Sequence, residues 1–422
     1  MQADRPTGES AAAFEDPPPH AVLEVLEVET FGSGGLAHYA DNLARALAAQ
    51  GHRVALLTTR VRELDAVTPD RGAGSGDGAR ILRRLAPWAQ RLERSPRLVA
   101  SGLRKLEALL DAVRIAVTVL RTRPGIVHLH CTNPAALVHA LLVRLVAPLS
   151  GGPRLVATSH VVLPHEPMPL QRQVFGSLYR LCHAVIAHSR HDRDRLIGEL
   201  GVDPSRVAVI PHGDYGFFAS QDAGIAEKRQ SARSDLALGE GDEVALFFGY
   251  VREYKGLDVL LDAWPEVAAR RPRARLVVAG DPVRLPPERR RELRARAEGL
   301  GAVVHLEYVP FERVESYFAA ADVLVLPYRR VSQSGVLYLA LALGLPVVAS
   351  RIGAWSEMLA DGENALLVEP QSPGEIADAV ASVLADPALG QRLAAGGRAL
   401  AAEHSWPRVA ERTAELFAAL AR

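Results

Sequence analysis

Two cationic residues follow the first strand expected in the second half of the chain. The segment GYVREYKG, Gly249–Gly256, places Arg252 and Lys255 just beyond the carboxyl end of that strand. Arginine can bind an anion through two parallel N–H groups and lysine acts as a point charge, so the pair fits a diphosphate. The alternative is an exposed loop whose charges are solvated.

A polar turn followed by a helix start offers a second place for an anion. Residues 332–350 read SQSGVLYLALALGLPVVAS, which predicts an apolar helix that begins at Ser334-Gly335-Val336 and ends at Gly344. The first turn of a helix presents unpaired N–H groups and a partial positive charge, and glycine allows a phosphate to approach closely. A serine-capped core helix without a ligand is the alternative.

A glycine-rich turn, Phe31–Gly35, follows the first strand expected in the chain. Such turns allow backbone N–H groups to bind an anion. The spacing is not GxGxxG, and the second expected strand, in VALLTTR, has no acidic residue at its end. A dinucleotide site is therefore disfavoured, and a tight turn without a ligand stays open as the alternative.

Short apolar runs alternate with stretches of helical period along the chain, which predicts an α/β protein with parallel sheets covered on both faces. The strands expected in the first half are Val22–Val28, Val54–Thr58, Ile126–His130, Leu155–Thr158, Ala184–Ala187 and Val207–Ile210. Those expected in the second half are Val244–Gly249, Leu276–Ala279, Val303–Leu306, Val323–Leu326, Val347–Ala349 and Ala365–Val368. This pattern indicates two Rossmann-like domains whose sheets face each other across an interdomain cleft. Ligands of such sheets bind beyond the carboxyl ends of the strands.

The domain boundaries follow from polar segments. We expect a disordered tail over 1–20, which contains Pro17-Pro18-Pro19, and a flexible loop over Pro69–Gly78. The N-terminal acceptor domain would span 21–215 and the C-terminal donor domain 216–400. A final helix, 401–422, would cross back to the N-terminal domain.

Composition excludes several classes of protein. Lys+Arg and Asp+Glu number 49 each, so no net charge favours nucleic acid. The two cysteines, Cys131 and Cys182, lack metal-ligand spacing and fit a reducing, cytoplasmic setting. The most apolar helix, near Leu137–Leu149, is too short and too charged to span a bilayer.

Four segments occur in an order that resembles one known family. They are FGSGGLAHYADNLARALAAQGHRVALLT, FFGYVREYKGLDVLLDA, the SGV helix with ALGLPVVAS, and IGAWSEMLADGENALLVEP. Over about Ala21–Arg422 the chain is similar to the retaining, nucleotide-sugar-dependent glycosyltransferases of family 4, which have the GT-B fold.

The resemblance assigns roles to matching residues. Arg252 and Lys255 would hold the donor diphosphate and, with His160, would be catalytic. The implied donor-binding residues are Gly34, Gly35, Gly249, Arg252, Lys255, Val309, Ser334, Gly335 and Val336. The implied acceptor-binding residues are His130, Asn133 and His160.

The chain departs from the family most clearly at two positions, and in addition Arg252 lies three residues before Lys255, whereas the commoner pattern has its arginine five before, where this chain has Tyr250. Val331 and Leu339 stand where many members have paired glutamates, so the chain resembles a subgroup with a QSGV turn. In that subgroup the backbone amides of Ser334–Val336 would take over contacts to the donor. Donor identity cannot be carried over without the glutamates.

The expected activity is transfer of a hexosyl-type group from a nucleoside diphosphate sugar to an acceptor hydroxyl, with retention at the anomeric carbon. The acceptor would be a glycan, a lipid-linked sugar or a natural product. No metal or cofactor is expected, and Asp192-Arg193-Asp194 reads as part of a helix cap with Ser189 rather than as a metal site. The alternatives are a GT-B-fold epimerase or phosphorylase, or a catalytically silent sugar-nucleotide-binding protein.

Residues 80–123 carry eleven basic and three acidic residues, with Trp88 and several leucines among them. Such a segment could lie on the inner face of an anionic membrane as a peripheral contact, or bind a lipid-diphosphate acceptor. The alternative is a solvated helix face.

Overall fold

The computed structural model describes residues 21–32, 34–60, 78–86, 97–131, 133–164, 168–216, 225–282, 285–331 and 333–422. The predicted tail over 1–20, the predicted loop from Pro69 to position 77, and Trp88 lie outside these ranges.

The first half of the chain forms a parallel sheet which, within the described residues, has seven strands in the order β3-β2-β1-β4-β5-β6-β7. The strands are β1 (Glu24–Val28), β2 (Arg53–Thr59), β3 (Arg80–Leu85), β4 (Ile126–Cys131), β5 (Arg154–Ser159), β6 (Ala184–Ala187) and β7 (Val207–Val209). All six predicted strands are present. The prediction missed β3, whose sequence RILRRL buries only Leu82 and Leu85 because the strand lies at the sheet edge.

Helices cover both faces of this sheet. They are α1 (Gly34–Ala49), α4 (Arg97–Thr122), α5 (Ala135–Val146), α6 (Gln171–Leu181) and α7 (Arg190–Leu200), with short turns η2 (Ala147–Leu149) and η3 (Pro204–Arg206). Leu43 and Leu47 of α1 pack on one face, and the other face carries Ile115 of α4 and Val143 of α5.

The second half forms a parallel sheet of six strands, counted over the same described ranges, in the order β10-β9-β8-β11-β12-β13. The strands are β8 (Glu243–Phe248), β9 (Ala274–Ala279), β10 (Val303–His305), β11 (Val323–Leu326), β12 (Val347–Ser350) and β13 (Leu366–Val368). The helices are α8 (Ile225–Asp235), η5 (Glu253–Lys255), α9 (Leu257–Arg270), α10 (Pro287–Gly299), α11 (Phe311–Ala320), α12 (Gly335–Leu343), α13 (Trp355–Met358), α14 (Pro373–Ala385) and α15 (Pro387–Glu403). The predicted fold class, two Rossmann-like domains with parallel sheets, is confirmed.

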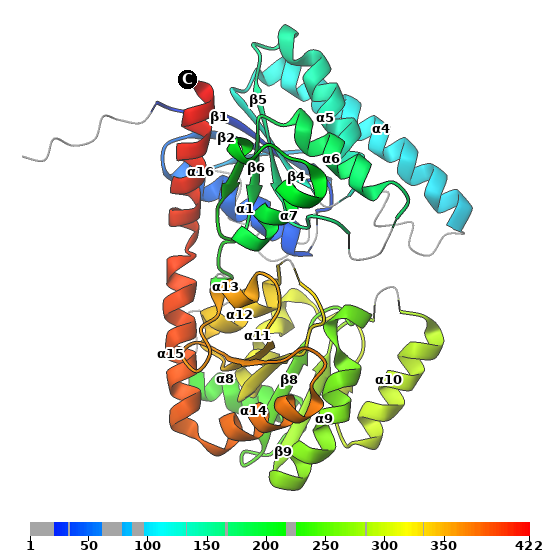
Figure 1. Ribbon diagram of the computed structural model, residues 1–422, viewed down its shortest axis with the longest axis vertical. Helices are drawn as coiled ribbons and strands as arrows, with labels where there is room; N and C mark the ends of the chain where they lie inside the picture. The colour runs from blue at the N-terminus through cyan, green and yellow to red at the C-terminus, as the bar shows by residue number, and fades with distance from the viewer. Residues whose placement is uncertain are drawn as a thin grey trace, which may run out of the picture.

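The last helix, α16 (Trp406–Ala421), packs against α1 of the first domain, and with α15 it runs along one side of both domains (Figure 1). Trp406 and Phe417 join the core cluster of Leu43 and Leu47. The two chain segments that pass between the domains are bonded to each other, since Asp214 N–H donates to the His404 carbonyl and Trp406 Nε1 donates to the Asp214 carbonyl.

None of the helices in the described ranges has the length and apolar character needed to cross a membrane.

Candidate active site

The turn after β8 meets the start of α12. Gly249 has a φ of 96°, and a Cβ there would lie 2.9 Å from both Lys255 Nζ and Val336 Cγ2. Any side chain at this position would therefore collide with both groups. The structure thus brings together Gly249, Lys255 and Val336, three of the predicted donor-binding residues.

Lys255 is a buried cation. Its side chain is 7% exposed, and its Nζ lies 5.2 Å from the centroid of the Tyr328 ring. Burial lowers the pKa of Lys255 below its usual range, and the charge of Arg252 acts in the same direction. Among the described residues no carboxylate forms an ion pair with Lys255. The Tyr328 ring stabilises the ammonium in part, and an anionic ligand would neutralise its charge.

The loop that carries Arg252 and Lys255 is held in place by ion pairs and by a hydrogen bond to its backbone. The Asp258 carboxylate accepts from both terminal nitrogens of Arg329, at 3.0 and 2.9 Å, and from Arg289 at 3.0 Å. Arg329 also donates to the carbonyl of Glu253 at 2.6 Å. Arg252 itself is half-buried and is the N-cap residue of η5.

The first turn of α12 is largely buried. Ser334 is the N-cap residue, and its Oγ lies 3.5 Å from the hydroxyl of Tyr328. A Cβ at Gly335 would lie 2.9 Å from the Tyr215 ring. Val331 and Leu339 are buried in the core of the domain, and Val309 packs against that core.

The start of α1 faces the start of α12 across Tyr215. The Tyr215 hydroxyl donates to the Gly35 carbonyl at 3.5 Å, and a Cβ at Gly35 would lie 3.0 Å from that hydroxyl. The turn before α1 is held by Glu29, whose carboxylate accepts from the N–H groups of Phe31 and Gly32. Gly34, with a φ of 68°, has open space around it.

A buried chain of charged and aromatic groups ends at His160. The parallel register of β1 and β4 sets Glu27 beside His128. Glu27 Oε2 lies 2.7 Å from His128 Nδ1 and 2.8 Å from His130 Nε2. His130 Nδ1 then lies 3.2 Å from His160 Nε2. Glu27 was not among the predicted site residues.

These hydrogen bonds determine which nitrogen of the His130 ring and of the His160 ring carries the proton. Burial alone would raise the pKa of Glu27, but His128 and His130 outweigh burial and lower it to about 2, so the carboxylate is ionised. Glu27 therefore accepts from Nε2 of His130, which leaves Nδ1 of His130 to accept from Nε2 of His160. Burial lowers the pKa of both His130 and His160, so both rings are neutral at neutral pH. Nδ1 of His160 is left as a hydrogen-bond acceptor.

The two other predicted acceptor residues have partners inside the protein. Both ring nitrogens of His130 are engaged by Glu27 and His160. Asn133 is half-buried, and its Oδ1 accepts from Ala135 N–H at 2.9 Å, at the start of α5.

Two further contacts join the domains near these groups. The Glu357 carboxylate on α13 accepts from Arg190 N–H at 3.0 Å and from His191 N–H at 2.6 Å, at the first turn of α7. The rings of His38 and Phe311 stack with centroids 5.6 Å apart. A carboxylate at a helix N-terminus is favoured by the helix dipole, so Glu357 holds the two domains together.

Comparison with known proteins identifies the family. The description "Glycosyltransferase Family 4" matches residues 33–213, and "Glycosyl transferases group 1" matches residues 242–386. D-inositol 3-phosphate glycosyltransferase of Segniliparus rotundus is 30% identical over 327 residues, which cover 74% of this chain and 71% of that one. The chain belongs to glycosyltransferase family 4.

Other relatives and solved structures agree. The protein of the same name from Acidothermus cellulolyticus is 28% identical over 92% of this chain and 86% of its own. For the relative from Nocardioides sp., 34% identical, the matched part covers only 53% of its length. The crystal structure of Anabaena HepE with UDP-glucose superposes with a TM-score of 0.72 at 18% identity, over 94% of this chain and 100% of that one. That likeness shows the GT-B fold of the family 4 enzymes.

One group of described residues has the composition of a metal site. The ligand atoms of Glu27, His128 and His130 all lie within 4.8 Å of one another. Their separations of 2.7 and 2.8 Å are hydrogen-bond distances, and the three residues are buried.

The helix cap predicted for Ser189 and Asp192 is confirmed, since Ser189 Oγ accepts from Asp192 N–H at the start of α7.

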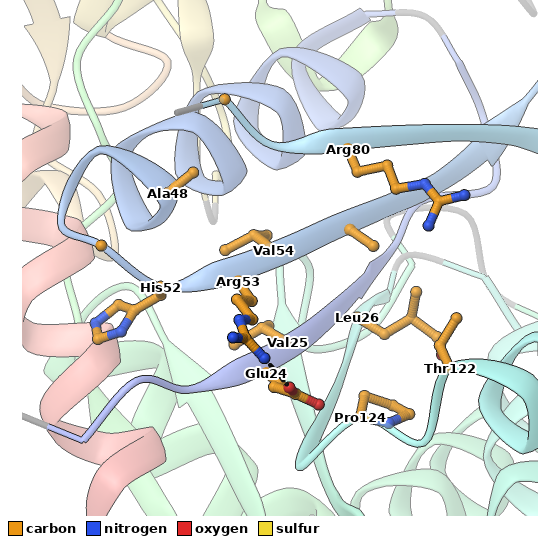
Figure 2. A pocket seen from close by; sticks show the side chains of 13 residues that line it. Glu24, Val25, Leu26, Ala48, His52, Arg53, Val54, Arg80, Thr122 and Pro124 are labelled. Atoms are coloured by element: carbon orange, nitrogen blue, oxygen red, sulfur yellow. Dashed lines mark hydrogen bonds and ion pairs between the residues drawn. The ribbon is translucent and has the colours of Figure 1, made fainter. Parts of the chain in front are cut away.

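A pocket of about 430 Å³ lies at the opposite end of the first sheet, next to the amino ends of β1 and β2 (Figure 2). Arg53 and Glu24, which line it, pair at 2.9 Å. Ligands of parallel sheets bind at the carboxyl ends, so we do not assign this pocket to the glycosyltransferase reaction.

Proposed function

We propose that this family 4 glycosyltransferase moves a hexosyl group from a nucleoside diphosphate sugar to an acceptor hydroxyl, with retention and without a metal. The observation that carries the proposal is Lys255, a buried cation without a carboxylate partner among the described residues, beside the N-terminus of α12. Arg252 lies in the same loop. Together they fit a diphosphate.

The reaction needs stabilisation of the leaving group. The bond from the anomeric carbon to the diphosphate oxygen breaks, and its electron pair stays on the diphosphate. Lys255, Arg252 and the N–H groups at the start of α12 lower the energy of that charge. The acceptor oxygen bonds to the anomeric carbon on the same face, and its proton passes to a diphosphate oxygen, so no protein carboxylate acts as base.

His160 would orient the transferred sugar. Its free acceptor nitrogen, Nδ1, would accept a hydrogen bond from a sugar hydroxyl, and Glu27 and His130 keep that nitrogen unprotonated. Of these three hydrogen-bonded residues, His160 is the one that would touch substrate, and Glu27 and His130 are positioning residues.

The names of relatives suggest where to begin with substrates. HepE binds UDP-glucose in its crystal structure, and several relatives are named for D-inositol 3-phosphate. We propose a uridine nucleotide as the first donor to test and a phosphorylated polyol as the first acceptor. The two buried free thiols, Cys131 and Cys182, fit a cytoplasmic setting.

A panel of UDP-, GDP-, dTDP- and ADP-sugars, each with and without inositol phosphate, tests the proposal. We expect nucleotide release that requires acceptor, and a product whose anomeric configuration by NMR equals that of the donor. Arg252→Ala should lower kcat/KM by about 10²–10³, whereas Arg294→Ala, an exposed residue on α10, should not. Turnover without acceptor would instead identify an epimerase, and nucleotide binding without turnover across acceptors would identify a silent protein.

A further inference from the structure

Large apolar side chains are exposed in one part of the first domain. Of the thirteen that the structure describes as exposed, eight lie on α4, α5 and η2. Those on α4 are Leu106, Leu109, Val113 and Val117, spaced so that they lie along one side of the helix. A concentration of this kind on a folded domain marks an interaction surface.

The second helix continues the same surface. Its exposed apolar residues are Val138, Leu141, Leu145 and, in η2, Leu149. Leu145 and Leu149 are each 71% exposed. Helices α4 and α5 pack side by side against one face of the sheet and lie at the outer edge of the first domain (Figure 1), so their outward sides face the same way. We call these eight residues the α4–α5 surface.

Charge is sorted around this surface. The acidic residues of α4, Glu107 and Asp111, are both buried. Asp111 accepts from Ala86 N–H at 3.0 Å and from Arg114 at 2.9 Å, which anchors α4 to the end of β3. The exposed charged side chains that the structure describes on α4 and α5 are instead basic: Lys105, Arg121 and Arg144.

We propose that the α4–α5 surface docks on a membrane surface that contains anionic lipid. Leucine and valine side chains would enter the boundary between headgroups and acyl chains, and the basic residues would meet lipid phosphates. A second copy of the chain, related by a two-fold axis, would bring the same basic residues against each other. Charge complementarity therefore favours anionic lipid over a dimer.

This placement overlaps the segment 80–123 that the sequence pointed to, since α4 lies within it. Arg80, Arg83 and Arg84 lie on the edge strand β3 rather than on a helix. The lipid contact would use α4, which lies within that segment, and α5, which lies beyond it. Helix α5 begins at Ala135, shortly after the carboxyl end of β4, so its first turn lies at the same edge of the sheet as the candidate active site.

Vesicle co-sedimentation of the full chain tests the inference. At low salt we expect the protein to sediment with phosphatidylglycerol vesicles, to stay in solution with phosphatidylcholine vesicles, and to be released as salt rises. Leu109→Asp/Leu145→Asp should abolish sedimentation. Lys105→Glu/Arg121→Glu should weaken it by about tenfold or more.

Matched controls separate docking from folding. Val22→Asp replaces an exposed apolar residue at the start of the first domain, and Arg291→Glu/Arg294→Glu reverses exposed charges on α10. Both should sediment like wild type, and all variants should keep their unfolding temperature and nucleotide binding.

Three results would overturn the proposal: wild-type protein that ignores anionic vesicles at low salt, leucine variants that sediment unchanged, or a dimer in solution that Leu109→Asp/Leu145→Asp dissociates. The last would show that a second copy covers the surface. None depends on catalytic activity, so a failure here is distinct from a failure of the proposed reaction.

Discussion

Replacing Lys255 with methionine should make the protein more stable in the absence of nucleotide. Methionine keeps an unbranched apolar stem and removes the charge. Burial lowers the pKa of Lys255, so the charged form is less favoured in the folded state than in the unfolded chain and its burial costs stability. The Tyr328 ring, 5.2 Å away, offsets part of that cost. We expect a net gain of about 1–2 kcal/mol, or a rise in Tm of about 2–4 °C.

Bound nucleotide should make wild-type protein more stable than Lys255→Met, the reverse of the order expected without nucleotide. Wild-type protein at a hundredfold excess of UDP over Kd gains about 2.7 kcal/mol. Loss of one charge partner weakens binding by about 10²–10³, which removes nearly all of that gain. Lys255→Met should therefore unfold at a higher temperature than wild type without UDP and at a lower one with UDP.

Thermal unfolding with and without UDP measures both effects. Lys228→Met, in the same domain, serves as the control because Lys228 pairs with Glu315 at 3.1 Å. Its loss should lower Tm slightly and leave the response to UDP intact. If Lys255→Met lowers Tm and still responds normally to UDP, Lys255 supports the fold and does not bind phosphate.

Three further outcomes follow from the site. Glu27→Gln should lower kcat/KM by about ten- to a hundredfold with UDP affinity unchanged by calorimetry, because a neutral amide oxygen is a weaker acceptor than a carboxylate and holds the two histidines less firmly; an equal loss of UDP binding would contradict the positioning role. Wild type should lose about 3 kcal/mol more than Glu27→Gln as pH falls from about 4.5 to 2 in denaturant titrations, since the folded pKa of Glu27 lies at about 2 and its ordinary value is 4.5; parallel losses would refute the shift. Gly335→Ala should weaken UDP binding at least tenfold because its Cβ would meet Tyr215 at 2.9 Å, whereas Gly374→Ala, with open space, should bind normally.

The donor-binding part of the site could be predicted from the sequence because each of its signals lies within one short segment. A glycine directly after a strand, two cations within the next six residues and a glycine at a helix start are each visible within one segment. Parallel sheets place such segments at one edge, so their meeting could be expected. The structure adds the contact of this segment with Val336 of α12. It also adds the ion pairs that Arg289 and Arg329, from other parts of the domain, make with Asp258.

The hydrogen-bonded group of Glu27 and the histidines could not be predicted from the sequence in the same way. Glu27 lies in EVLEV, where a charged residue between Leu26 and Val28 suggests a side chain that faces solvent. Its burial requires that β1 be a central strand, that its register set Glu27 beside His128, and that α16 return from the end of the chain to cover that face. The one available signal was the pair His128 and His130, whose spacing of two residues places both rings on one face of a strand.

The edge strand β3 was missed for a related reason. Its two buried leucines are separated by two arginines, which breaks the apolar alternation on which strand prediction depends. The arginines belong there because an edge strand is exposed, and charged side chains on it disfavour pairing with other chains.

Tyr215 links the assembly of the site to the approach of the two domains. Gly35 and Gly335 belong to different domains, yet both need the space that a side chain would take from this one phenol. Tyr215 follows Asp214, which is bonded to His404 and Trp406 where the chain crosses back. Any rotation of one domain against the other must therefore move Tyr215 and separate the N-termini of α1 and α12. Lys255, Arg252 and α12 all belong to the second domain and would stay together, so such a rotation would instead open the space between them and the start of α1 to water.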